Sequence, residues 1–132
     1  MDGNSYNDNP KNVLNRKSLA FASRIVKLFK HLQEKEHEFI LSKQILRSGT
    51  SIGANIYESM YAQSTADFIS KLHISLKEAS ETHYWLDLLY DNKFLTEDER
   101  KSLLNDCFEL IRLLTASIKT SKTKLEQNKT NK

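Results

Sequence analysis

Apolar residues recur every three or four positions along four long segments of this chain, and this spacing constrains the fold more than any other feature. In the first segment the apolar residues fall on a single helical face, at Leu14, Phe21, Ile25, Leu28 and Leu32. The chain has only three glycines and one proline, too few for the many turns of a β fold. The spacing therefore predicts long amphipathic helices.

Three further segments show the same pattern and are separated by short polar connections. The second extends from about residue 38 to 61, the third begins near residues 64–65, and the fourth follows Thr96. Thr96 and Glu99 form a capping box, a pairing that starts many helices. Four amphipathic helices predict an all-α fold, an antiparallel up-down four-helix bundle.

Composition marks the expected limits of this bundle. Residues 1–12 are rich in Asn and Asp and hold the only proline, which predicts a disordered leader. Residues 13–120 form the predicted bundle, and residues 121–132 form a basic, frayed C-terminal tail. No apolar run is long enough to cross a membrane, and none follows a basic start as in a secretory signal. We therefore expect a cytoplasmic protein.

The positive charge of the chain is concentrated at its C-terminal end. The net charge is +3, yet the residues from Lys119 onward hold five lysines and one glutamate, a net charge of +4. Such a tail is typical of a solvated helix end, and the alternative is contact with nucleic-acid phosphates. The candidates for phosphate contact are Lys119, Lys122 and Lys124.

The stretch RSGTSIGANIYES, residues 47–59, could be a phosphate-binding loop or part of a helix. A Walker A loop has four residues between its glycines, followed by Lys and Ser or Thr. Gly49 and Gly53 are separated by three residues and followed by Ala54, which excludes that loop. On a helix the two glycines lie one turn apart on one flank. Each costs about 1 kcal/mol there, and close packing of another backbone is the expected reason.

A stripe of polar side chains follows the other flank of this helix, beside its apolar face. Its members are Gln44, Arg47, Ser51, Asn55 and Glu58. We interpret the stripe as structural: its side chains would hydrogen-bond across helices or subunits and fix the packing register. The alternative is a ligand-binding or catalytic site, but the stripe has no histidine that could activate a nucleophile.

The third helix has a second face that carries Glu78, Glu81 and Trp85. Two carboxylates one turn apart could bind a metal, but a di-iron bundle needs Glu-x-x-His motifs on two helices, and no predicted helix has one. We expect no metal, no cofactor and no small-molecule substrate. We place these three residues near a subunit interface, where the carboxylates could meet a cation such as Arg47.

Two further side chains are candidates for chemistry. His83 falls in the apolar stripe of the third helix between Ala79 and Leu86, so we expect a packed, hydrogen-bonded core histidine. Cys107 is the only cysteine, which excludes an internal disulfide. It faces inward on the fourth helix, and no charge pattern marks it as an activated thiolate.

One pattern suggests an enzyme. Arg24 and His31 lie on nearly the same face of the first helix with six residues between them. This spacing resembles the Arg-x(4–6)-His motif of helical ribonucleases of the HEPN superfamily, in which the pair would polarise and protonate at the scissile phosphate. A ribonuclease that uses Arg24 and His31 is therefore the alternative to a non-enzymatic protein.

The stretch KQILRSGTSIGANIYES, residues 43–59, resembles the signature of the bacterial four-helix-bundle proteins encoded by intervening sequences in 23S ribosomal RNA genes. That signature reads approximately Gln-x-x-Arg-(Arg/Ser)-x-x-Ser-Ile-x-x-Asn-Ile-x-Glu. Residues 67–89 are similar to the third helix of the family, and the resemblance covers about residues 18–120. The matching residues are Gln44, Arg47, Ser51, Ile52, Asn55, Ile56, Glu58, Glu78, Glu81 and Thr82.

The resemblance implies an antiparallel bundle that assembles as a homopentamer around a central channel, with no known enzymatic activity. Relatives encoded beside retroelement reverse transcriptases are similar to accessory proteins that bind nucleic acid and the polymerase through basic surfaces. We expect a non-enzymatic oligomeric scaffold. Its expected partners are copies of itself and RNA or a nucleic-acid-processing protein, without a membrane.

Overall fold

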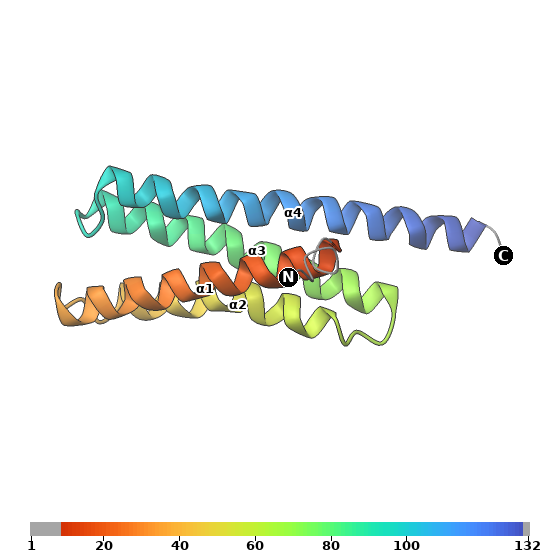
Figure 1. The fold of residues 1–132 in the computed structure, drawn as a ribbon, viewed down its shortest axis with the longest axis horizontal. Coiled ribbons are helices and arrows are strands. Elements are labelled where there is room, and N and C mark those ends of the chain that lie inside the picture. The colour runs from red at the N-terminus through yellow and green to blue at the C-terminus, as the bar shows by residue number, and fades with distance from the viewer. Residues whose placement is uncertain (1–8, 131–132) are drawn as a thin grey trace, which may run out of the picture.

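The computed structural model describes residues 9–130, which form four helices and no strand. The connections from α1 to α2 and from α3 to α4 lie at one end of the molecule, and the connection from α2 to α3 lies at the other (Figure 1). The chain is therefore all-α, with a bundle-like packing of its helices. The helices are α1 (Pro10–Glu34), α2 (Leu41–Ser59), α3 (Thr65–Asp91) and α4 (Glu97–Thr130).

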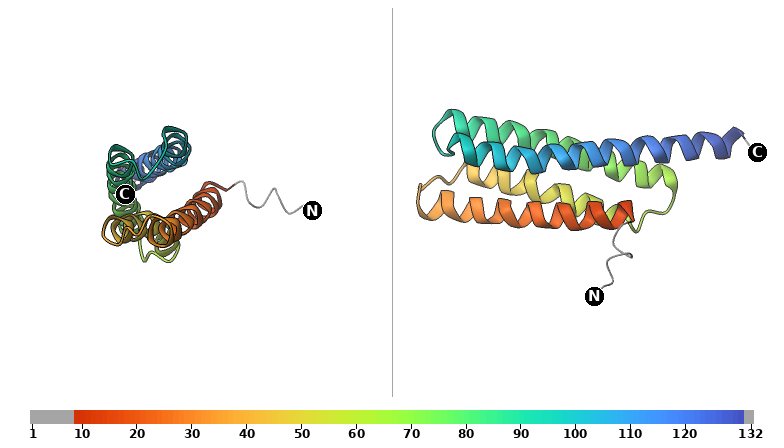
Figure 2. Two further views of the ribbon diagram at one scale, coloured as in Figure 1. Left: turned by 90° about the vertical axis from the view of Figure 1, so that its left-hand side faces the viewer. Right: turned by 45° about the horizontal axis from the view of Figure 1, so that its top comes forward.

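The apolar stripes of all four helices contribute to one core. The view along the bundle shows the four helices running lengthwise beside one another (Figure 2). Side chains of α1 and α4 also form ion pairs at the seam between these two helices. Arg24 Nη1 lies 2.7 Å from Asp106 Oδ2, and Lys17 Nζ lies 3.1 Å from Glu109 Oε2. The largest fully buried apolar side chains are Phe21, Ile25, Leu32, Ile45, Ile52, Ile56, Leu72, Leu86, Leu89, Leu110 and Leu114.

Side-chain caps begin α3 and α4 where the sequence predicts them. The Thr96 N–H donates to Glu99 Oε1 at 2.8 Å, and the Glu99 N–H donates to Thr96 Oγ1 at 3.1 Å. These two hydrogen bonds form the expected capping box. Ser64 caps α3, because its Oγ accepts from the Asp67 N–H at 3.1 Å.

The start of α2 differs from its prediction by three residues. The helix begins at Leu41, not near Glu38, because the Glu38 carboxylate itself caps the first turn. It accepts hydrogen bonds from the N–H groups of Ile40, Leu41 and Ser42. Burial raises the pKa of Glu38, but these backbone hydrogen bonds together outweigh burial and hold it below its usual value.

The first and last helices both extend beyond residues 13–120, the predicted limits of the bundle. Residues 1–8 of the expected leader lie outside the described residues, but α1 already begins at Pro10. Proline suits a first helical position because its missing N–H would have no partner there, and Asn9 caps the turn by accepting from the Lys11 N–H. At the other end, residues 121–130, the predicted basic tail, continue α4. This stretch has no glycine or proline that would end the helix.

Gly49 and Gly53 both face α1. A Cβ built on Gly49 would lie 2.8 Å from Ile25 Cγ1 and 2.9 Å from Ile25 Cγ2, whereas one built on Gly53 would lie 3.2 Å from Ser18 Oγ. Ile25 is fully buried and β-branched, and therefore has little rotamer freedom. The helix that approaches these glycines closely is thus α1 of the same chain.

We expect Gly49→Ala and Gly53→Ala to differ in their effects on stability. Overpacking against Ile25 should lower the free energy of unfolding by about 1–3 kcal/mol for Gly49→Ala, only partly offset by the better helix propensity of alanine. Gly53→Ala meets a rotatable hydroxyl and should be close to neutral. Urea unfolding of the two variants measures the difference. A larger loss for Gly53→Ala would contradict this account.

Candidate functional site

A charged network joins the outer edges of α2 and α3. Arg47 Nη1 donates to Glu78 Oε1 at 3.2 Å, and Arg47 Nη2 donates to Glu81 Oε2. Trp85 Nε1–H donates to the same Glu81 oxygen at 2.8 Å. One arginine thus bridges the two carboxylates, and an indole N–H holds one of them in place. The helix that the polar stripe of α2 meets is α3 of its own chain.

A layer of buried hydroxyl groups lies in the same interface. Thr82 Oγ1 donates to Ser48 Oγ at 2.9 Å, and Ser75 Oγ donates to the Ile52 carbonyl oxygen at 2.8 Å. All three hydroxyl-bearing side chains are fully buried. Sequence reasoning missed this layer, although Ser48 interrupts the apolar stripe of α2 at a position that faces the core. A small hydroxyl residue at such a position is the signal that could have found it.

The other residues of the polar stripe differ in their contacts. Ser51 Oγ donates to the Arg47 carbonyl oxygen at 2.6 Å, and Asn55 Nδ2 donates to the Ser51 carbonyl oxygen at 2.8 Å. Glu58 Oε1 lies 3.1 Å from Lys71 Nζ on α3, and Gln44 is exposed. Within this chain the stripe therefore ties α2 to α3 at Arg47 and Glu58. Its predicted role at a subunit interface stays a prediction.

Electrostatics favour the ionised forms of Glu81 and Arg47. The hydrogen bond from Trp85 lowers the pKa of Glu81; burial opposes this effect, and Arg47 adds to the lowering. Glu81 in turn raises the pKa of Arg47. A carboxylate with a lowered pKa is a poor proton donor at neutral pH. Among residues 9–130, no three His, Cys, Asp or Glu side chains are grouped to hold a metal ion.

His83 is not a core residue, contrary to the prediction. Its side chain is 38% exposed, and its Nε2 lies 3.0 Å from Asp87 Oδ2, while its ring packs edge-on against Phe108 at a centroid distance of 4.9 Å. Thr82 occupies the buried step between Ala79 and Leu86. The prediction failed because neighbouring positions on a helix differ by 100°, and the hydroxyl residue, not the imidazole, faces inward.

Cys107 is buried at the interface of α4 with α3. Its Sγ lies 3.4 Å from the Ala79 carbonyl oxygen. Burial, with a smaller contribution from the charge of Asp106, raises the pKa of this thiol to about 12. The thiol is therefore protonated near neutral pH and is a poor nucleophile.

The two residues of the ribonuclease hypothesis have separate partners. Arg24 Nη1 donates to Asp106 Oδ2, and Arg24 Nη2 donates to Ser102 Oγ at 2.8 Å, both on α4. His31 Nε2 lies 3.7 Å from Glu36 Oε2. Arg24 thus serves as a link between α1 and α4, and its guanidinium is not directed at a shared site with His31.

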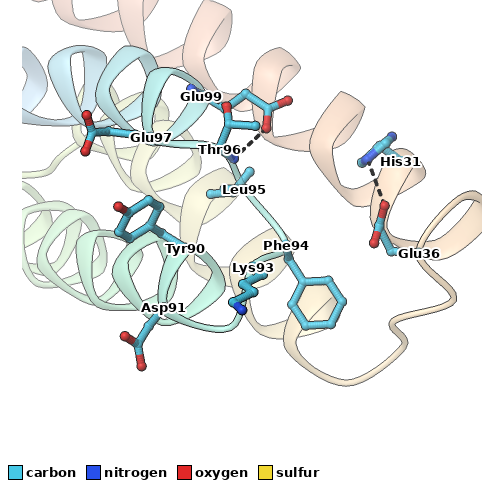
Figure 3. A pocket seen from close by; sticks show the side chains of 10 residues that line it. All are labelled: His31, Glu36, Tyr90, Asp91, Lys93, Phe94, Leu95, Thr96, Glu97 and Glu99. Carbon is cyan, nitrogen blue, oxygen red and sulfur yellow. Dashed lines mark hydrogen bonds and ion pairs between the residues drawn. The ribbon is translucent and has the colours of Figure 1, made fainter.

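His31 lines an open hollow of about 730 Å³ at the end of the bundle where α3 connects to α4 (Figure 3). Glu36, Lys93, Thr96 and Glu99 also line it. Figure 3 shows that the carboxylate of Glu36 points toward His31, while Glu99 caps α4 through Thr96. Arg24 does not line this hollow. In this hollow, Thr96 and Glu99 form the cap of α4, and His31 faces Glu36. Among the described residues, no nucleophile is paired with His31 as a base.

The candidate phosphate-binding lysines lie in the C-terminal part of α4, a helix whose last turns extend past the α2–α3 connection (Figure 1). All three are exposed. Lys119 and Lys122 are about 60° apart around the helix axis, whereas Lys124 is rotated from Lys119 by about 140° and lines a hollow beside the start of α1. The three lysines therefore do not form a single patch.

Comparisons with known proteins give one consistent result. Residues 11–116 match the sequence model of a family described as 23S rRNA-intervening sequence protein. A similar solved structure, at 1.70 Å resolution, is a protein of unknown function from the S23 ribosomal protein family of Bacteroides thetaiotaomicron VPI-5482. It is 55% identical, with a TM-score of 0.83, and the match covers 83% of this chain and 98% of that one. No curated protein matches the chain.

We expect the charged network to make folding stability depend on pH. Because the pKa of Glu81 is lower in the folded chain, its contribution is present above its unfolded value, about 4.3, and is lost as pH falls through the folded pKa. The drop in the free energy of unfolding between pH 7 and pH 3 should therefore be smaller in Glu81→Gln than in wild type. Urea unfolding at both values measures it. An equal drop would show that Glu81 is not stabilised as an anion.

Proposed function

Since the chain belongs to the 23S rRNA-intervening sequence protein family, a family of unknown function, we propose that it is a non-enzymatic scaffold. In this proposal the helices form an antiparallel up-down bundle, copies of the bundle assemble as a homopentamer, and the assembly associates with RNA or with a protein that processes nucleic acid. A cytoplasmic location belongs to the same proposal. None of the helices that the structure describes is apolar enough over its length to span a bilayer.

The observation that carries the proposal is the way the family-signature residues are used. Arg47 forms ion pairs with Glu78 and Glu81 between α2 and α3. Thr82 is hydrogen-bonded to Ser48. Ser51 and Asn55 hydrogen-bond to backbone carbonyl groups. A signature of this kind specifies the packing of helices. The function it supports is therefore the presentation of surfaces, and not chemistry at a pocket.

Self-association is supported by large apolar side chains that remain exposed. Leu19 is 68% exposed on α1. Tyr57 near the end of α2 and Tyr61 just after it are also exposed, and their ring centroids lie 5.6 Å apart. Ile74 and Tyr84 are exposed on α3. Large apolar side chains that remain exposed often mark protein interfaces.

We expect the native mass of the wild-type chain at micromolar concentration to be about five times the 15.3 kDa of one chain. Burial of the exposed apolar side chains between copies would provide the free energy. Native mass spectrometry, with light scattering after gel filtration as a second measurement, determines the number of copies. A monomer at this concentration would contradict the scaffold proposal.

Nucleic-acid association is supported by the charge of the extended part of α4. The residues from Lys119 onward have a net charge of +4, and they lie beyond residues 11–116, the part that matches the family. A basic helix that extends past the bundle can approach a phosphate backbone without steric hindrance from the other helices.

The double variant Lys119→Gln/Lys122→Gln is expected to bind single-stranded RNA more weakly than wild type. The slope of log affinity against log salt should become shallower by about 0.7 for each phosphate that the variant no longer neutralises. Fluorescence anisotropy at several salt concentrations measures both quantities. Lys93→Gln/Lys101→Gln is the matched control, because it removes the same charge at the other end of the bundle.

Three outcomes would contradict parts of this proposal. No binding by wild type at low salt would exclude RNA as a direct partner. Equal losses in the two double variants would exclude α4 as the contact. RNA that is cleaved by wild type and left intact by His31→Ala would favour the ribonuclease hypothesis.

A further inference from the structure

We infer that the hollow beside the start of α1 binds the anion of a fatty acid, with the carboxylate between two lysines and the hydrocarbon chain on apolar side chains. This ligand goes beyond the proposed scaffold function, and the sequence predicted no small-molecule substrate. The hollow has a volume of about 550 Å³, within the usual range of small-molecule sites. It lies between Lys11 and Leu14 of α1, Phe68 of α3, and Leu113, Thr120 and Lys124 of α4.

The hollow is open because α4 presents short side chains to the start of α1. Further along the seam between these two helices, the ion pair of Lys17 with Glu109 bridges them. Nearer the start of α1, the side chains of α4 that face the hollow are small or carry a single hydroxyl group, and they are too short to fill the space between the helices. These side chains are Ala116, Ser117, Thr120 and Ser121.

The lining of the hollow changes from apolar to cationic along its length. Leu14 and Leu113 lie toward its inner end, and Leu14 is buried. Lys11 and Lys124 lie toward its outer end, where α1 begins and α4 continues (Figure 1). Lys124 follows Leu113 by about three turns and therefore lies on the same face of α4, about 16 Å further along the axis. A ligand with one apolar end and one charged end matches this order.

The charge of the hollow favours an anionic ligand. Neither Lys11 nor Lys124 belongs to an ion pair within residues 9–130. None of the described residues that line the hollow is acidic, whereas Glu36, Glu97 and Glu99 line the hollow at the other end of the bundle. Two ammonium groups of this kind attract a carboxylate, and they would repel a cationic ligand.

Lys11 is positioned beside the apolar lining by an aromatic ring. Its Nζ lies 4.9 Å from the centre of the Phe68 ring, which is an attractive cation–π contact. An ammonium group has three N–H donors, so contact with one ring leaves donors for a carboxylate. The ammonium group of Lys11 is thus held where the apolar chain of a ligand would end.

The ligand's length follows from the position of these groups along α4. Side chains lean toward the N-terminus of their own helix, so the side chain of Lys124 leans back toward Thr120, whose hydroxyl group is a further donor. From Thr120 to Leu113 the distance along the axis is about 10 Å. A carboxylate near Thr120 then places an acyl chain about as long as that of decanoate on Leu113 and Leu14.

The volume of the hollow distinguishes an acyl chain from a helix of another molecule. A helix with its side chains is about 10–12 Å wide, so this volume would hold only about one turn of it. The same volume holds a complete short acyl chain. The inferred occupant is therefore a free fatty acid.

Calorimetric titration of the wild-type chain with decanoate, below the concentration at which decanoate forms micelles, tests the inference. We expect one bound decanoate per chain. Affinity should rise from butanoate through octanoate to decanoate, by up to about fourfold for each methylene group. Decyltrimethylammonium, which has the same chain and the opposite charge, should bind at least about tenfold more weakly than decanoate, because the two lysines repel it.

Substitutions in the hollow test the location of the site. Lys11→Gln/Lys124→Gln should weaken decanoate binding about tenfold, since two exposed charge pairs are lost. The matched control is Lys27→Gln/Lys30→Gln, which removes the same charge from exposed positions of α1 outside the hollow and should bind as wild type does. Thr120→Trp should abolish binding by filling the hollow. Thr120 is exposed, so the fold should tolerate this change, and circular dichroism checks the helix content of each variant.

Several results would overturn the inference. Equal affinity for decanoate and decyltrimethylammonium would show that the lysines do not select the ligand. Equal losses in the two double variants, or undiminished binding by Thr120→Trp, would place the site elsewhere.

Two further results would assign the hollow to a different occupant and would also overturn the inference. Dissociation of assembled copies when decanoate is added, measured by native mass spectrometry, would mean that another copy occupies the hollow. Binding to phosphatidylglycerol vesicles without binding of free decanoate would assign the lysines to a membrane surface. The native mass and the RNA affinity of the wild-type chain test the scaffold function separately.

Discussion

The contact between α2 and α3 determines the geometry on which the rest of the surface depends. Thr82 and Ser48 form a buried hydroxyl pair, and Ser75 binds the carbonyl group of Ile52. A buried hydrogen bond that is broken leaves an unsatisfied polar group, so a shift of one helix along the other is costly. Apolar side chains alone would allow such a shift more easily. The hydroxyl layer therefore fixes the relative height of the two helices.

The charged network of Arg47, Glu78, Glu81 and Trp85 lies in the same α2–α3 interface as this layer, at its exposed edge. Arg47 is half-exposed and its partners are partly exposed, so solvent screening limits what the ion pairs add to stability. Their geometric effect is larger: Glu81 holds the indole of Trp85, against which Tyr84 packs. The same polar residues thus join two helices and orient an exposed aromatic side chain. Both effects suit a protein whose proposed function is the presentation of surfaces.

The differences between prediction and structure have specific physical causes. His83 was assigned to the core because its spacing from Ala79 and Leu86 fits a helical stripe, but Thr82 fits the same stripe and its hydroxyl finds a buried partner. The start of α2 was misplaced because the caps expected at helix starts are short side chains at the capping position, whereas Glu38 reaches forward to three N–H groups. α4 continues past residue 120, the predicted limit of the bundle, because lysine and glutamate favour helix and residues 121–130 contain no glycine or proline.

The sequence by itself determined the four helices, two of their caps and the family, because apolar periodicity, capping residues and signature residues are local patterns that a single chain displays. It also placed Gly49 and Gly53 on the flank opposite the polar stripe. Only the tertiary structure decided which helices these flanks meet: α1 beside the glycines and α3 beside Arg47. It likewise decided that Arg24 belongs to the seam with α4. Periodicity gives the direction of a side chain around its own helix axis, but not the identity or height of the neighbouring helix, which depends on contacts between residues far apart in the chain.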